Sequence, residues 1–167
     1  MATVVEPARA IQRTQRLMIA HGLFILFIGM VAGVGLLISL LGGLEVWPGR
    51  IVPIDVPGGS AAWGRLHLGQ ILNAFLIILT ALALPVLDAD ARFARRLNWM
   101  VVGTGWANTA FYVAALFAPN RALTFGDNRW GRGDLAATLG LVPALVFALI
   151  SILAVAMLAW RALRAAA

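Results

Sequence analysis

The chain has 167 residues, of which 62% are hydrophobic and only 12% are charged. A soluble domain carries about 25% charged residues, so this sequence lacks the polar surface that a soluble fold needs. It has no cysteine, which excludes disulfides and thiolate chemistry. Its net charge of +6 comes from scattered basic residues rather than one basic stripe, so we expect a lipid bilayer as partner and no nucleic acid.

Four apolar segments are long enough to cross a bilayer, which takes about 20 residues. We predict membrane helices over residues 16–41, 62–87, 93–117 and 135–159. Glycines and prolines predict an irregular first loop, and charged residues predict a short second loop. The first and third loops are long, and we expect both to fold back over the end of the bundle. The sequence therefore predicts an all-α fold, a single integral membrane domain over residues 1–167 built as a four-helix transmembrane bundle.

The arginines indicate the orientation of this bundle. Eight lie in the N-terminal segment, the second loop and the C-terminal segment, and five lie in the first and third loops. Because basic residues favour the cytoplasmic side of a membrane, we expect both termini in the cytoplasm.

Polar side chains inside the second predicted helix are the first candidates for function. His67, Gln70 and Asn73 lie in a segment where hydrocarbon offers no hydrogen-bonding partner. Each step of three residues rotates the side chain by about −60°, so His67 and Asn73 point about 120° apart. Only a large bound group can contact both. Two interpretations of His67 stay open: a hydrogen bond to a neighbouring carbonyl, or ligation of a metal.

The third predicted helix carries Thr104, Asn108 and Tyr112, whose spacing of four places them on one face. Thr104 is most simply bonded to a carbonyl of its own helix. Asn108, like Gln70, is typical of interhelical hydrogen bonds, which are worth about 0.6 kcal/mol on average. Tyr112 lies about five residues inside the helix, which is deep for an interfacial anchor.

His21 is the other histidine, near the start of the first predicted helix. His67 lies near the start of the second, which begins at the opposite face of a core about 30 Å thick. The two imidazoles are therefore too far apart to ligate one haem iron. If His67 binds a haem, the other axial position is open, as a Lewis-acid or substrate site requires.

Several segments carry a resemblance to a known family. They are Gly43-Leu44-Glu45-Val46-Trp47-Pro48-Gly49, Val56-Pro57-Gly58, Trp63-x-Arg65-x-His67-x-Gly69-x-x-Leu72-Asn73, Gly105-Trp106-x-Asn108-x-x-Phe111-Tyr112 and Pro119-Asn120-Arg121-x-Leu123-Thr124-Phe125-Gly126-x-Asn128. In order and spacing, from about His21 to beyond Asp134, the sequence resembles the styrene oxide isomerases.

The resemblance implies a protein of the bacterial inner membrane that assembles as a homotrimer and binds haem b between protomers. It implies a Meinwald rearrangement of small hydrophobic aryl epoxides, such as styrene oxide, to arylacetaldehydes, with ferric haem b as the Lewis acid. His67 then matches the axial iron ligand, and Asn73 and Tyr112 match catalytic residues. Asn108, Thr104 and Gln70 are secondary candidates. A family aspartate falls at Thr104 here, so the pocket lacks that charge.

Two other functions are consistent with the residues. A b-type cytochrome for electron transfer requires a second axial ligand, for which His21 is badly placed. A cofactor-free small transporter or structural subunit uses the polar side chains only as interhelical hydrogen bonds.

Overall fold

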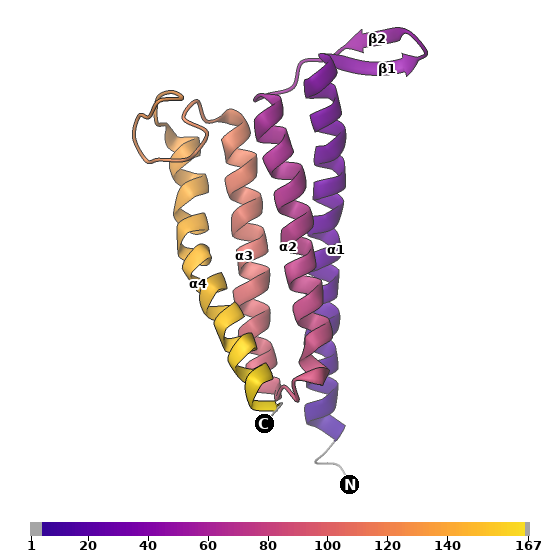
Figure 1. Cartoon of the computed structure of the whole chain (residues 1–167), viewed down its shortest axis with the longest axis vertical. Helices are drawn as coiled ribbons and strands as arrows, with labels where there is room; N and C mark the ends of the chain where they lie inside the picture. The colour runs from indigo at the N-terminus through magenta and orange to yellow at the C-terminus, as the bar shows by residue number, and fades with distance from the viewer. Residues whose placement is uncertain (1–4, 166–167) are drawn as a thin grey trace.

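Four long helices make up most of the computed structural model, which describes residues 5–165 (Figure 1). They are α1 (Val5–Leu41), α2 (Ser60–Val86), α3 (Ala91–Phe117) and α4 (Leu135–Ala165). Each contains a segment long and apolar enough to cross a membrane. The prediction of four membrane-length helices is therefore confirmed, although α1 begins before residue 16 and α4 extends beyond residue 159. The start of α1 and the end of α4 lie at the same end of the bundle.

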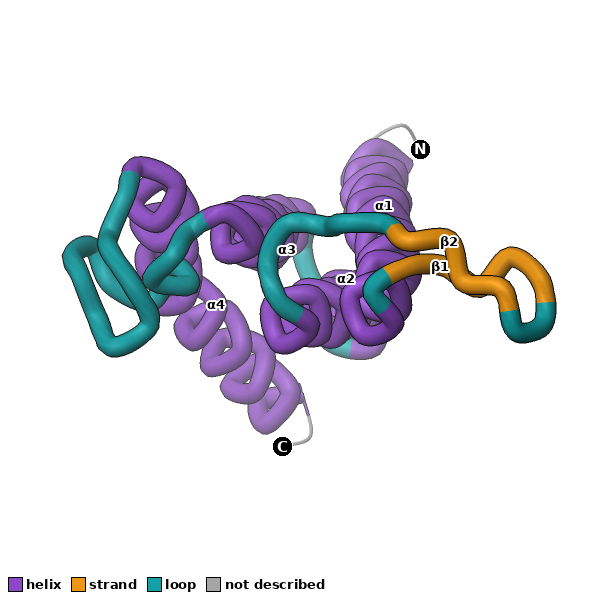
Figure 2. The backbone as a smooth tube through the Cα atoms, turned by 90° about the horizontal axis from the view of Figure 1, so that it is seen from above, coloured by secondary structure: helices purple, strands orange, loops and turns teal. Residues whose placement is uncertain are grey.

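The first loop contains a β-hairpin. The prediction that this loop is irregular is therefore wrong, and the fold is mostly rather than entirely helical. Strands β1 (Gly43–Trp47) and β2 (Arg50–Pro53) pair antiparallel. The glycine at the turn adopts a φ of +79°, and its N–H donates to the Glu45 carboxylate at 2.6 Å. Both strands of this two-stranded sheet are edge strands, so Pro53, which has no N–H to donate, is tolerated in β2. Figure 2 shows the hairpin projecting outward beyond α1, so this part of the loop does not fold back over the bundle, whereas Gly58 after it lies against Leu116 of α3.

The third loop, residues 118–134, does pack on the end of the bundle as expected. Its centre is Asn120, which is fully buried and whose Nδ2 donates to the Thr124 and Gly126 carbonyls at 2.8 and 2.9 Å. Ala122 is also fully buried and joins an apolar cluster with Ala137 of α4. These contacts close the loop without regular secondary structure.

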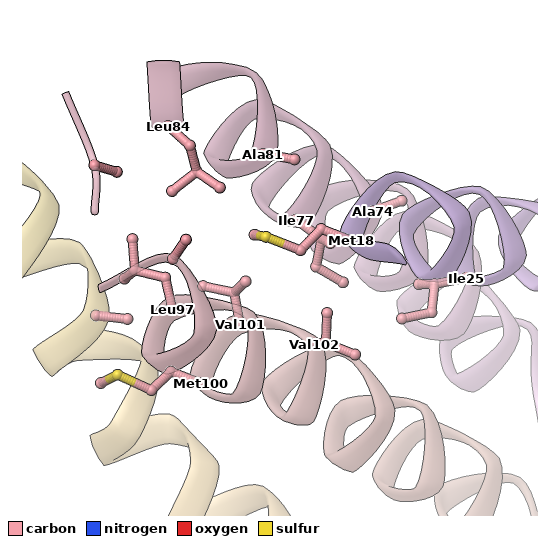
Figure 3. Packing of buried hydrophobic residues seen from close by; sticks show 13 residues of the cluster. Met18, Ile25, Ala74, Ile77, Ala81, Leu84, Leu97, Met100, Val101 and Val102 are labelled. Carbon is pink, nitrogen blue, oxygen red and sulfur yellow. The ribbon is translucent and has the colours of Figure 1, made fainter. Parts of the chain in front are cut away.

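The largest apolar cluster, shown in Figure 3, occupies the half of the bundle nearer the termini, and smaller clusters lie toward the hairpin and the third loop. There α1, α2 and α3 pack side by side, and α4 packs chiefly on α3. The largest fully buried apolar side chains of this cluster are Met18, Ile25, Ile77, Leu84, Leu97 and Val101. His67, Gln70, Asn73, Asn108 and Tyr112 lie beyond this cluster, toward the hairpin, and Thr104 lies at its edge.

Candidate active site

His67 turns its partly buried ring from α2 toward α1. Its Nδ1 lies 2.8 Å from the carbonyl oxygen of Gly29. Since a carbonyl only accepts, Nδ1 carries the proton and donates it. Nε2 then holds the lone pair, and no hydrogen bond among the described residues uses it. Proteins orient metal-ligating histidines in this way, so the two interpretations of His67 are compatible with each other.

Two glycines of α1 make room for this part of α2. A Cβ at Gly33 would lie 2.9 Å from both Cε1 and Nδ1 of His67. A Cβ at Gly29 would lie 3.0 Å from Cβ of Gln70. Sequence analysis overlooked these glycines, although their Gly-x-x-x-Gly spacing is a known signal of close packing in membrane helices. Here the notch at Gly33 receives the imidazole ring.

Gln70 is fully buried between α2 and α3. Its Nε2 donates to the Thr109 hydroxyl at 2.7 Å, and that hydroxyl donates to the Gly105 carbonyl at 2.8 Å. The interhelical hydrogen bond expected of Gln70 is therefore present. It fixes α2 against α3 one turn from His67.

Asn73 faces α3, away from His67. Its Oδ1 accepts from Nδ2 of Asn108 at 2.9 Å, and its own Nδ2 donates to the Gly69 carbonyl at 2.8 Å. The interhelical bond of Asn108 is therefore also present. The predicted divergence is confirmed, since His67 contacts α1 while Asn73 contacts α3.

Tyr112 lies directly against Gly69 of α2. A Cβ at Gly69 would collide with the ring carbon Cε2 and lie 2.7 Å from the phenol oxygen. The ring also packs at 5.3 Å, centroid to centroid, on Phe111. Among the described residues, no hydrogen bond engages the Tyr112 hydroxyl. Because Asn73 bonds the Gly69 carbonyl, Gly69 brings the two predicted catalytic side chains to one side of α2.

Thr104 lies apart from this pair. Its hydroxyl donates to the Met100 carbonyl of its own helix at 2.7 Å, with the Phe147 carbonyl of α4 at 3.3 Å. The bond to its own helix is confirmed, and the contact with α4 separates Thr104 from Asn108 and Tyr112, which contact α2. Each step of four residues advances about 40°, which turns the stripe from α4 toward α2.

His21 is engaged elsewhere. Its Nδ1 accepts from the Trp106 indole N–H at 3.2 Å, with the rings edge to face. His21 precedes Gly29 by eight residues, or about 12 Å along α1 at 1.5 Å per residue. It is therefore too distant to share an iron with His67 in one protomer.

A haem fits these residues better than a metal ion held by protein ligands alone. No group of three His, Cys, Asp or Glu side chains that could hold a metal ion occurs among residues 5–165. Haem iron already has four porphyrin nitrogens and requires only one axial side chain. The oriented His67, with Nε2 available, meets that requirement.

Comparison with known proteins identifies the family of the chain. The family model described as styrene oxide isomerase matches residues 14–163. A styrene-oxide isomerase from Pseudomonas fluorescens is 39% identical over 150 residues, which cover 90% of this chain and 89% of that protein. The matched region includes His67, Asn73 and Tyr112. The chain therefore belongs to the styrene oxide isomerase family and is an isomerase.

Proposed function

We propose that the chain rearranges aryl epoxides, such as styrene oxide, to arylacetaldehydes, with one haem b held by His67. The observation that carries the proposal is the orientation of His67, whose Nδ1 donates to Gly29 while Nε2 stays available. The substrate class comes from the family and from the name of the relative.

When bound, ferric haem b supplies a Lewis acid that withdraws electron density from the epoxide oxygen. His67 would hold the group, and the Gly29 carbonyl and the Gly33 notch fix the angle of the imidazole ring. His21, the other histidine, bonds Trp106 and lies too far along α1 to join His67 within one protomer.

Tyr112 and Asn73 are the groups that bind and orient the epoxide. The Tyr112 hydroxyl donates a hydrogen bond to the oxygen as the benzylic C–O bond opens and negative charge grows on it. Asn73 retains one amide N–H after its bond to Gly69, and Asn108 holds its other end. Both donors are held in place before the reaction begins.

The apolar surroundings decide the product. Opening of the C–O bond leaves positive charge on the benzylic carbon, which water would trap as a diol. Rings such as Phe111, beside Tyr112, contribute an apolar wall that excludes water. A hydride then moves from the neighbouring carbon to the benzylic carbon, which yields the aldehyde with no net oxidation or reduction.

We also propose a homotrimer with each haem between two protomers. The support is the divergence within one protomer, where His67 lies on the α1 side of α2 and Asn73 and Tyr112 lie on the α3 side. Two copies together can present the iron ligand from one and the donors from the other. The arginine distribution further supports an inner-membrane protein with both termini in the cytoplasm.

The test compares oxidation states of one preparation. Haem-loaded protein in membranes is assayed for phenylacetaldehyde from styrene oxide, first oxidised, then reduced with dithionite, then reoxidised. We expect a Soret band and activity in the ferric form alone, restored on reoxidation. Equal activity in both states contradicts Lewis-acid catalysis, and activity without a Soret band contradicts the cofactor. A low-spin bis-histidine spectrum without isomerisation indicates an electron carrier instead.

A further inference from the structure

A groove of about 570 Å³ lies between α3 and α4, at the end of the bundle where α3 begins and α4 ends. It is far from His67, Asn73 and Tyr112, which lie in the half toward the hairpin. The proposed reaction therefore makes no use of it.

One part of the groove is strongly basic. Arg92, Arg95 and Arg96 line it from the first two turns of α3, and all three are exposed. Among the described residues, the ion pair at this end joins Asp90 to Arg161, at 3.7 Å. The three guanidinium groups also lie at the positive end of the α3 dipole, where cations are unfavourable and an anion is stabilising.

The rest of the groove is apolar. Trp99 and Met100 continue the lining along α3, and Leu153 and Met157 face them from α4. The side chain of Leu153 is 56% exposed. A tryptophan of this kind is typical of the level where lipid headgroups meet hydrocarbon. The basic part therefore lies at headgroup level, and the apolar part extends toward the acyl chains.

A second group of three arginines shows that positive charge near the membrane does not by itself produce such a groove. Arg9, Arg13 and Arg16 of α1 line a smaller cavity of about 340 Å³, together with Gln12 and Leu17. Orientation in the membrane is a sufficient reason for arginines of this kind. It does not account for the apolar channel beside α3.

We propose that the α3–α4 groove binds one anionic phospholipid, such as phosphatidylglycerol. Arg92, Arg95 and Arg96 bind its phosphate by charge-assisted hydrogen bonds. One acyl chain lies along Trp99 and Leu153. The single negative charge of the lipid offsets part of the +3 charge of the three arginines, and its acyl chain fills the space between α3 and α4.

The first test removes the charge. Binding of phosphatidylglycerol and of phosphatidylcholine to the purified protein in mild detergent is measured by native mass spectrometry. The Arg92→Gln/Arg95→Gln/Arg96→Gln variant should bind phosphatidylglycerol roughly 100-fold more weakly, at about fivefold per arginine near the surface. Equal affinity of the wild type for both lipids, or unchanged affinity of the variant, overturns the proposal.

The matched control carries the same change in charge on α1. The affinity of the Arg9→Gln/Arg13→Gln/Arg16→Gln variant for phosphatidylglycerol should stay within about threefold of the wild type. This change is smaller than the roughly fivefold loss expected for one arginine that contacts the lipid. An equal loss in this variant means that the lipid responds only to total charge, which contradicts a site at α3.

A second variant tests the apolar part and remains informative if the arginine variant fails to fold. Leu153→Trp fills the groove, leaves every charge in place and alters an exposed position. It should also lose bound phosphatidylglycerol. Retention of the lipid contradicts the proposal. A change in the mass of the oligomer means that a second copy of the chain covers the groove, which overturns it as well.

Discussion

The two halves of the bundle are held together by different kinds of contact. Toward the termini, buried aliphatic side chains from all four helices interlock (Figure 3). Toward the hairpin the apolar clusters are smaller, and interhelical hydrogen bonds that involve His67, Gln70 and Asn73 join the helices as well. Such bonds contribute only about 0.6 kcal/mol each, so their value lies in placing polar atoms. Activity and stability should therefore respond separately to substitutions in the two halves.

The largest expected effect comes from His67→Ala. Without the imidazole, the proposed iron loses its axial ligand, so the Soret band should disappear and phenylacetaldehyde formation should fall to the uncatalysed rate. His21→Ala is the control, because His21 bonds Trp106 in the same bundle. It should keep both signals, and loss of haem from this variant would show that the two histidines act together.

Tyr112→Phe tests the Tyr112 hydroxyl as a hydrogen-bond donor without disturbing packing. The ring still fills the space against Gly69, but the hydroxyl donor is gone. Removal of one donor to a developing oxyanion lowers kcat by about 100-fold or more. The Soret band and the thermal unfolding midpoint should stay as in the wild type. An unchanged kcat would assign Tyr112 a structural role.

Gly33→Ala tests whether the notch holds the ring of His67. The new methyl group would lie 2.9 Å from Cε1 and Nδ1 of the imidazole and would displace it. We expect haem affinity to fall by about 10- to 100-fold, the usual cost of disturbing the groups that orient a metal ligand. The control is Gly64→Ala, whose methyl group would meet only Leu36, at 3.9 Å. Equal haem affinity in the two variants contradicts the notch.

Ile77→Ala tests whether a substitution in the apolar half lowers stability without changing turnover. Ile77 is fully buried, and truncation of such a side chain leaves a cavity that costs about 2–5 kcal/mol. The unfolding midpoint in detergent should fall, while turnover per bound haem at low temperature stays constant. Leu79→Ala, at a position 64% exposed on the same helix, should change neither. Loss of turnover in a folded Ile77→Ala protein would show that the halves are coupled.

The four helices could be predicted from sequence because membrane span length and hydropathy leave little choice. The hairpin could not, since its strands are short and contain the prolines and glycines that usually mark irregular loops. Besides the backbone pairing of the two strands, its turn is closed by the hydrogen bond from the Gly49 N–H to the Glu45 carboxylate. Periodicity carries no information on such a contact.

The polar residues of the site could be predicted from the sequence, but the neighbouring helix that each side chain contacts could not. Helical rotation gave the angle between His67 and Asn73, yet it could not say which neighbouring helix each side chain meets. The same limit explains Thr104, because four-residue spacing drifts far enough over two turns to change neighbours. Gly33 carries no chemistry of its own, and its role depends on a ring contributed by another helix.

Asp90→Ala has the smallest expected effect. It should lower the stability of the fold without changing turnover. Oδ1 of Asp90 caps α3 by accepting from the Phe93 and Arg92 N–H groups, both at 2.9 Å. The hydrogen bond from Phe93 is the main cause that lowers the pKa of this carboxyl group, and Arg92 and Arg161 add to it. Loss of such a cap costs about 1 kcal/mol.

The pH dependence of this cost follows from the lowered pKa. The folded state binds the proton more weakly than the unfolded state, so the stabilisation by ionised Asp90 is complete at neutral pH. It disappears as the pH falls below about 4. Thermal unfolding between pH 3 and 7 should show the wild type above Asp90→Ala at pH 7 and near it at pH 3, with turnover per haem the same in both. An equal gap at pH 3 and pH 7 would mean that the side chain acts by packing rather than by charge. Asp90 and Asn108 are 18 residues apart, or about 27 Å along α3 at a rise of about 1.5 Å per residue. Reduced turnover would mean that the start of α3 is coupled over this distance to the polar half.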